Sequence, residues 1–285
     1  MARSTSTAQP LKTLREQATA IEAAMLECLA KPAKRSVHKL RTSTRRIEAQ
    51  LELLAMLPEL PQHAKPREKL LRLLKKVRQA AGDVRDLDVQ RDLIAEALPK
   101  NARGHKAEDL RKEARQLKQA LKQKRDQLAD ELLTVVKAEK ADLPLAFTRL
   151  FDSLENAGSL SISESDLTAL IHTWYSQHTP AAPPDIDDVE HLHDIRKFAK
   201  LARYLAESAP KSAESSRRLA ARFEDLQEAG GQWHDWLILA ESARNQLGGS
   251  AQLPIEFAAR AEKCLKSFER RIEKMTASTT QALAA

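Results

Sequence analysis

Apolar residues recur at intervals of three and four positions along most of the chain, which is the spacing of helices that bury one face. The first stripes run through residues 11–29 and 37–54, and a proline follows each of them. Further stripes cover residues 70–82, 89–98, 105–140, 145–154, 167–175, 189–209, 215–229, 233–247 and 254–275. No segment shows the sustained alternation of apolar and polar residues that a half-buried strand requires. The pattern predicts an all-α fold.

Glycine and proline mark the expected ends of these helices. Gly82 and the pair Gly230-Gly231 are expected to end helices, because glycine is a poor helix former and is common just past helix C-termini. Three prolines fall within residues 180–184, where a helix cannot continue. The expected units are an N-terminal helical bundle, a proline-rich linker and a C-terminal helical bundle, at residues 1–178, 179–188 and 189–285.

Composition excludes several other classes of protein. The chain has 285 residues and is 42% hydrophobic, which is enough for one or two cores. Only 7 residues are glycine and 4% are aromatic, which disfavours an all-β protein. The mean hydropathy is −0.50, and no apolar run approaches the roughly 20 residues of a membrane span, so no membrane partner is expected. No secretory signal is visible, and Cys28 and Cys264 are too few for a disulfide framework, so we expect a cytoplasmic protein.

Positive charge is concentrated in the first half of the sequence. The formal net charge is +7. Residues 1–140 contain 31 Lys and Arg against 19 Asp and Glu, whereas residues 141–285 contain 16 against 21. Such an imbalance indicates an anionic partner such as nucleic acid, a membrane surface or polyphosphate, although a solvated basic face without a partner is about as common.

One charged pattern occurs twice. It starts at His38 in the first copy and at His193 in the second, and both copies have arginine three positions later and a base seven positions later. Offsets of 0, 3, 7 and 10 residues lie within about 80° of one another on a helix, so each copy predicts an amphipathic helix with a cationic stripe. Each copy continues through a basic helix to a glycine that is followed by Asp86 or Asp235. The chain therefore looks like a duplicated helical bundle.

These motifs resemble those of the CHAD domain, the conserved histidine α-helical domain. The matching segments are His38-x-x-Arg41-x-x-x-Arg45-Arg46, Arg85-Asp86-Leu87-Asp88-Val89, His193-x-x-Arg196-x-x-x-Lys200-x-x-Arg203-Tyr204-x-x-Glu207, and Leu226-Gln227 with Gly231 and Asp235. They occur in order over nearly the whole chain. The resemblance implies two pseudo-symmetric antiparallel four-helix bundles around a central basic channel. It also implies non-enzymatic binding of linear inorganic polyphosphate and association with polyphosphate granules.

The sequence departs from the family's pattern at a few positions. Glu48 stands ten residues after His38, where the family tends to have another base, and Leu201 stands where a base often follows Lys200. Together with the acidic balance of residues 141–285, these departures lead us to expect that the N-terminal bundle contributes more to binding.

Arginine and lysine suit a polyphosphate ligand, because arginine presents paired N–H donors to phosphate oxygens and lysine supplies a movable charge. The candidate ligand-binding residues are His38, Arg41, Arg45, Arg46, Arg72, Lys75, Lys76, Arg85, Arg111, Arg115, Lys118, Lys122, His193, Arg196, Lys197, Lys200, Arg203, Arg218 and Arg222. Those in residues 105–140 form a second cationic stripe on a long helix, which a solvated surface would explain equally well.

Histidine and aspartate have more than one interpretation here. His38 and His193 are either phosphate donors or structural residues that position a neighbour. Asp86, Asp88 and Asp235 are expected to cap helices or to orient the arginines. Asp86 and Asp88 point to different faces of a helix, so we expect neither a metal nor any other cofactor.

Two other functions compete with polyphosphate binding. The pI of about 9.4 also fits a nucleic-acid-binding protein. The low aromatic content, however, provides few surfaces on which bases could stack. An enzyme that processes phosphoryl groups is a further alternative, although the sequence contains no glycine-rich phosphate loop and no recognisable catalytic motif.

Overall fold

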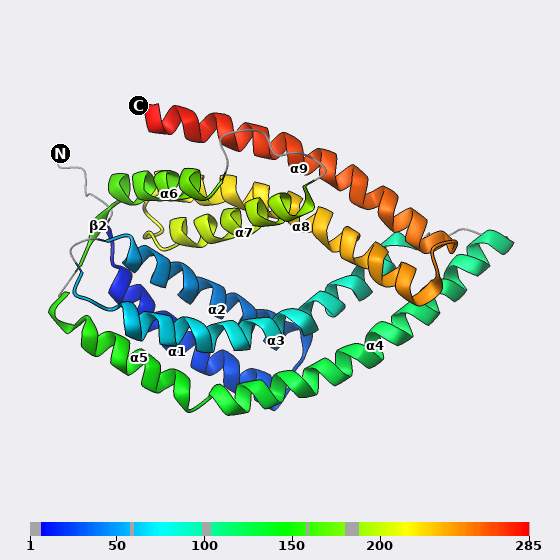
Figure 1. The fold of residues 1–285 in the computed structure, drawn as a ribbon, viewed down its shortest axis with the longest axis horizontal. Helices are drawn as coiled ribbons and strands as arrows, with labels where there is room; N and C mark the ends of the chain where they lie inside the picture. Colours follow the sequence, from blue (N-terminus) through cyan, green and yellow to red (C-terminus); the bar gives the residue numbers. More distant parts are fainter. Residues whose placement is uncertain (1–6, 58–59, 99–103, 158–159, 180–187, 285) are drawn as a thin grey trace.

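The computed structural model describes residues 7–57, 60–98, 104–157, 160–179 and 188–284, and it confirms the predicted all-α fold (Figure 1). The helices are α1 (Pro10–Ala30), α2 (Lys34–Ala55), α3 (Ala64–Ala97), α4 (His105–Glu139), α5 (Asp142–Ser153), α6 (Glu164–His178), α7 (Val189–Ala206), α8 (Glu214–Leu247) and α9 (Gln252–Ala284). Within these described residues, no helix is long and apolar enough to cross a membrane.

Short local contacts fix several ends of these helices. Pro10 opens α1, where its missing N–H costs nothing. The Ser163 hydroxyl accepts a hydrogen bond from the Asp166 N–H at the start of α6, and the Asp188 carboxylate accepts one from the His191 N–H at the start of α7. Two strands of two residues each, β1 (Thr7–Ala8) and β2 (Ile162–Ser163), pair in antiparallel orientation. Strands of two residues are too short to produce the alternation that would have predicted them.

The glycines that were expected to end helices lie inside them, so that prediction is wrong. Gly82 is within α3, and Gly230-Gly231 are within α8. A Cβ atom on Gly82 would lie 3.2 Å from a guanidinium nitrogen of Arg41, and one on Gly230 would lie 2.8 Å from the ring of Phe268. Close packing between helices therefore explains these two glycines better than helix termination does.

The chain folds into two helical halves that face each other (Figure 1). In the N-terminal half, α1, α2 and α5 pack with parts of α3 and α4 around a core that includes Leu40 and Leu132. In the C-terminal half, α6 and α7 pack with parts of α8 and α9 around a core that includes Phe223 and Phe268. The arrangement agrees with the expected pair of bundles.

A third core joins the two halves at one end. The long hairpins α3–α4 and α8–α9 extend beyond their own bundles and meet each other on the right of Figure 1. Leu87 and Leu117 from the first hairpin share this core with Leu239 and Phe257 from the second. The long helix predicted at residues 105–140 is thus α4, and its first half connects the two bundles.

Helix α6 packs with the C-terminal half, although it precedes the expected boundary at residue 178. Its buried residues Leu167 and Trp174 belong to the same core as α7, α8 and α9. Most of the expected linker at residues 179–188 lies outside the described residues. The division into units at residues 1–178 and 189–285 stays a prediction, and the packing favours a boundary before α6.

Candidate functional site

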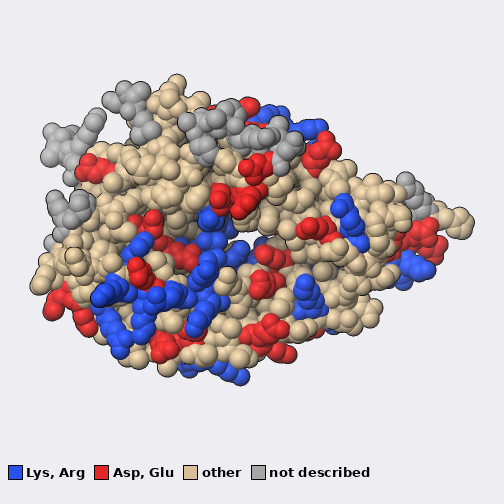
Figure 2. Space-filling view, viewed as in Figure 1, with Lys and Arg blue, Asp and Glu red and all other residues tan. Residues whose placement is uncertain are grey.

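A cavity of about 580 Å³ lies between the two halves, where α2 and α3 face α7 and α8. Its lining residues are His38, Arg41, Thr42, Arg45, Arg46, Arg85, Asp86, Val89, Arg196, Lys200, Arg203, Tyr204, Gln227, Glu228, Gly231, Gln232 and Asp235. Figure 2 shows that the surface is hollowed between the halves and that Lys and Arg side chains gather beside the hollow. The structure thus brings the two predicted cationic stripes together.

Four cations of this cavity form no direct ion pair in the described part of the chain, although Asp86 and Asp235 lie among them. Arg41 and Arg85 come from the N-terminal half, and Arg196 and Lys200 come from the C-terminal half. Among the described residues, none of the four side chains forms an ion pair or donates a hydrogen bond. Nη1 of Arg85 and Nε of Arg196 are fully buried without a hydrogen-bond partner. Buried donors of this kind are costly to leave unpaired.

Glycine and arginine approach closely in both halves. Gly82 of α3 leaves room for the guanidinium of Arg41 on α2, and Gly230 of α8 leaves room for Cβ of Arg196 on α7, which would lie 3.3 Å from an added Cβ atom. These arginines occupy the same position in the two copies of the motif, three residues after its histidine. Because glycine has no side chain, α3 can approach α2 closely at Gly82, and α8 can approach α7 closely at Gly230.

The other cations at the cavity are paired. Arg45 donates to Glu48 over 3.1 Å, and Glu48 also accepts from Arg78 over 2.6 Å. Arg203 is bonded to Glu207 and to Glu224, both over 2.7 Å. Arg46 pairs more loosely with Glu207, at 3.5 Å. A ligand would find these guanidinium groups already neutralised, unlike the four unpaired cations.

Lys200 is the only lysine among the described lining residues, and the pKa of its ammonium group is strongly lowered. Burial lowers its pKa to about 7, and the nearby charges of Arg196, Arg41 and Arg45 lower it in the same direction. Burial also lowers the pKa of Arg196, although the carboxylate of Asp235 opposes this change. Like charges are thus held together at a cost in free energy that a bound polyanion would offset.

The two predicted histidines lie in different places. His38 lines the cavity, and burial together with the neighbouring Arg85 lowers its pKa. His193 lies instead beside His234, with 5.0 Å between the ring centroids, in a separate groove of the C-terminal half. The pKa of His193 is also lowered, mainly by burial. Position favours a ligand contact only for His38.

The aspartates of the motifs do not cap helices. Asp86 and Asp235 lie well inside α3 and α8 and line the cavity among its cations. Burial raises the pKa of Asp235, while Arg196 opposes the rise. Asp88 points elsewhere and pairs with Arg125 of α4 at 3.2 Å. The expectation of helix caps is wrong, and an orienting role remains open to Asp86 and Asp235.

The remaining candidate residues do not line the cavity. They are Arg72, Lys75, Lys76, Arg111, Arg115, Lys118, Lys122, His193, Lys197, Arg218 and Arg222. Arg111, Arg115 and Lys118 line a different cleft at the start of α4. Three others are paired with carboxylates, namely Lys76 with Glu139, Lys197 with Asp194 and Arg218 with Glu214. A role in binding stays a prediction for this group.

Several lining residues were not among the candidates. Thr42, Gln227, Glu228 and Gln232 are polar, and Tyr204 contacts the guanidinium groups of Arg46 and Arg203 through its ring. Helical spacing could have found part of this set, because Gln227, Glu228 and Gln232 lie eight, seven and three residues before Asp235.

Comparisons with known proteins agree with this architecture. The family model described as the CHAD domain matches residues 12–244. The crystal structure of the CHAD domain from the plant Ricinus communis has a TM-score of 0.63 and 19% identity, and the match covers all of this chain and 94% of that one. PptA from Streptomyces chartreusis has a TM-score of 0.54 and 18% identity, with 98% of this chain and 100% of that one covered. None of the curated proteins matches the chain.

Proposed function

Because the chain belongs to the CHAD domain family, we propose that it is a binding module and that its cavity holds linear inorganic polyphosphate. The observation that carries the proposal is the set of four cations that form no direct ion pair among the described residues, Arg41, Arg85, Arg196 and Lys200. Two come from each half, so a ligand must present several anionic groups close together to reach them all. Repeated phosphates on a flexible chain meet this requirement.

The chemistry of the lining favours phosphate groups over bases. Arginine N–H groups match phosphate oxygens in pairs, and burial strengthens each charged hydrogen bond. Tyr204 is the only aromatic ring among the described lining residues besides that of His38, and two guanidinium groups contact it. Base stacking, on which single-stranded nucleic-acid binding usually depends, has little support here. A nucleic acid is therefore the second candidate ligand.

Calorimetric titration with long-chain polyphosphate tests the proposal. The variant Arg41→Gln/Arg196→Gln should weaken binding at least tenfold, because it removes an unpaired cation from each half. Arg270→Gln is the control, since Arg270 is exposed on α9 and lies outside the cavity. Equal affinities of the double variant and the wild type, with the helical content unchanged, would refute the proposed site.

Competition between ligands tests the identity of the polymer. Excess polyphosphate should displace single-stranded DNA of matched charge far better than the DNA displaces polyphosphate. The opposite order would make nucleic acid the ligand of this cavity. If polyphosphate binds as proposed, the protein should also sediment with polyphosphate granules, and the double variant should not.

A further inference from the structure

A second groove lies in the C-terminal half, along α8 and α9 beside the first turns of α7, and it has a volume of about 760 Å³. We call it the α8–α9 groove. Its described lining residues are Val189, Glu190, His193, Trp233, His234, Leu237, Ile238, Ala240, Glu241, Arg244, Ala258, Ala261, Glu262 and Leu265. Apolar side chains form most of its surface, and Val189 at its edge is 51% exposed. The polyphosphate proposal assigns no role to this groove.

The N-terminal half has a cleft in the equivalent position. It is lined by Lys34, Asp88, Arg91, Asp92, Lys118, Arg125 and Asp126. Lys34 lies four residues before His38, as Val189 lies four before His193. Asp88 lies two residues after Asp86, as Leu237 lies two after Asp235. On the next helix, Lys118 and Arg125 are seven residues apart, and so are Ala258 and Leu265.

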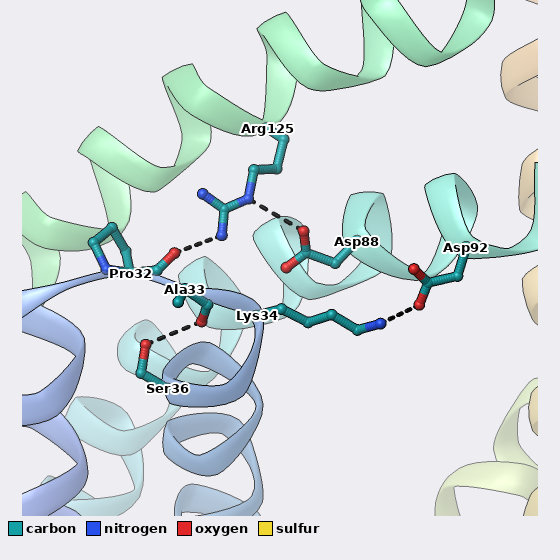
Figure 3. Close-up of polar contacts among 7 residues, drawn as sticks. All are labelled: Pro32, Ala33, Lys34, Ser36, Asp88, Asp92 and Arg125. Carbon is teal, nitrogen blue, oxygen red and sulfur yellow. Dashed lines mark hydrogen bonds and ion pairs between the residues drawn. The ribbon is translucent and has the colours of Figure 1, made fainter. Parts of the chain in front are cut away.

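Charged contacts bridge the walls of the N-terminal cleft. Figure 3 shows the guanidinium of Arg125 reaching from α4 to the carboxylate of Asp88 and to the backbone carbonyl of Pro32. Lys34 forms an ion pair with Asp92 in the same region. These contacts tie α4 to α3 and to the start of α2.

The α8–α9 groove has apolar residues at the positions that correspond to the charged residues of the N-terminal cleft. Leu237 replaces Asp88 and Leu265 replaces Arg125, so no ion pair crosses between these positions. Alanine stands at 240 and 258, where the first copy has Arg91 and Lys118. The two copies thus differ at five corresponding places, which are charged in the N-terminal cleft and apolar in the α8–α9 groove. Apolar surface that is left open in this way is typical of binding sites.

The shape and the charges of the groove indicate what it binds. Its lining positions on α8 run from Trp233 to Arg244, a length of roughly 16 Å at 1.5 Å per residue, which accommodates about three helical turns. Three carboxylates border it, those of Glu190, Glu241 and Glu262, against the single guanidinium of Arg244, and of the three only Glu262 forms an ion pair among the described residues, with Lys266 at 2.9 Å. We propose that the α8–α9 groove docks an amphipathic helix of another protein, which inserts its apolar face between α8 and α9 and presents basic residues to the acidic border. An amphipathic helix in an apolar groove is a recurring mode of recognition.

A synthetic 14-residue amphipathic helix of leucine and lysine is the probe, and its counterpart of leucine and glutamate is the matched control. Binding is measured by calorimetry and by tryptophan fluorescence, since Trp233 lines the groove. The leucine–lysine peptide should bind the full chain at least tenfold more tightly than the leucine–glutamate peptide.

The variant Leu237→Asp/Leu265→Arg restores the residue types of the N-terminal cleft. It adds one charge of each sign, so the net charge is unchanged and a loss of binding reports on the groove itself. The leucine–lysine peptide should bind this variant at least tenfold more weakly, while polyphosphate affinity stays the same. If the double variant does not fold, Ala258→Gln fills the groove with a neutral side chain and should weaken peptide binding in the same direction.

Three results would overturn the proposal. The first is equal binding of the two peptides, and the second is undiminished binding of the leucine–lysine peptide to the folded variants. The third is a wild-type dimer that becomes monomeric in the double variant, since a second copy of the chain would then occupy the groove. None of these results depends on whether the central cavity binds polyphosphate.

Discussion

Lys200 is a buried ammonium whose strongest charged neighbours are Arg196, Arg41 and Arg45. Its pKa is lowered from 10.5 to about 7 in the folded protein. Between these two values the unfolded chain binds more protons than the folded chain, so this residue makes stability rise with pH over that window. Below pH 7 the folded protein bears the full cost of the buried charge. The same charge is what an incoming polyanion would contact.

The variant Lys200→Met should therefore stabilise the free protein and weaken its binding of polyphosphate. We expect the free energy of unfolding to rise by at least about 1 kcal/mol at pH 6.5, where the ammonium is charged in both states, and by less at pH 9.5. Urea denaturation at the two pH values measures the gain. A gain that is absent at pH 6.5, or that is larger at pH 9.5, would show that Lys200 is not held charged against its surroundings.

Glu48 is an acidic residue in a basic site, and it lies where the second copy of the motif has Arg203. Its carboxylate accepts hydrogen bonds from Arg45 and Arg78 and thereby neutralises a cation of the cavity. Glu48→Gln should raise polyphosphate affinity several-fold at low salt, because Arg45 becomes available to phosphate. It should also lower stability by about 1–3 kcal/mol, because two guanidinium groups lose their counterion.

The matched control for this prediction is Glu214→Gln, which removes the partner of Arg218 on the exposed side of α8. That variant should change neither quantity appreciably, since exposed ion pairs contribute little. Titration calorimetry and thermal melting measure both effects. Weaker binding by Glu48→Gln would mean that Glu48 holds Arg45 in position for the ligand.

At the scale of helices, the three glycines inside α3 and α8 differ in what an added Cβ atom would meet. An added Cβ at Gly231 meets nothing within 4 Å, so Gly231→Ala should stabilise the protein by about 0.5–1 kcal/mol through helix propensity. At Gly230 it would meet the Phe268 ring at 2.8 Å, so Gly230→Ala should destabilise by about 1–3 kcal/mol. Chemical denaturation of the two variants should show opposite signs. Two changes of the same sign would contradict the packing described for α8.

Gly82→Ala should act on binding more than on stability. The added methyl group would meet the flexible end of Arg41, which can move aside, and alanine favours the helix. We expect the free energy of unfolding to change by less than about 1 kcal/mol, while polyphosphate affinity falls several-fold because the displaced guanidinium belongs to the cavity. Unchanged affinity would separate the position of Arg41 from ligand binding.

Much of this architecture is predictable from the sequence, and the exceptions have physical reasons. Periodicity located the helices, but it placed breaks at Gly82 and at Gly230-Gly231, because propensity alone does not reveal that a neighbouring helix needs the missing side chain. Spacing also placed the cationic stripes of α2 and α7. It could not tell which bases on the long helices face the cavity, since that depends on where α3 and α8 cross them. Arg85 lines the cavity, whereas Arg72 on the same helix does not.

At the scale of the whole molecule, the two halves carry different charges and line one cavity between them. The acidic balance of residues 141–285 led to the expectation that the N-terminal half dominates binding. Only the cations without a direct ion pair are divided equally, because Arg41 and Arg85 face Arg196 and Lys200. The extra basic residues of the first half lie outside it, for example in the separate cleft of α4. The expectation that the N-terminal half dominates binding therefore stays a prediction, which the net charge of each half does not decide.

The single variants Arg41→Gln and Arg196→Gln test this balance, because these arginines are equivalent in the two copies. Each should weaken polyphosphate binding by the same factor within about twofold, and each should lower the dependence of log affinity on log salt by about one counterion. Calorimetry at three salt concentrations gives both quantities. A large loss from Arg41→Gln with little loss from Arg196→Gln would bear out the expectation that the N-terminal half dominates. Comparable losses would mean that the ligand spans the interface, so that the third core, which joins the two hairpins, also keeps the two sets of cations at the spacing the polymer requires.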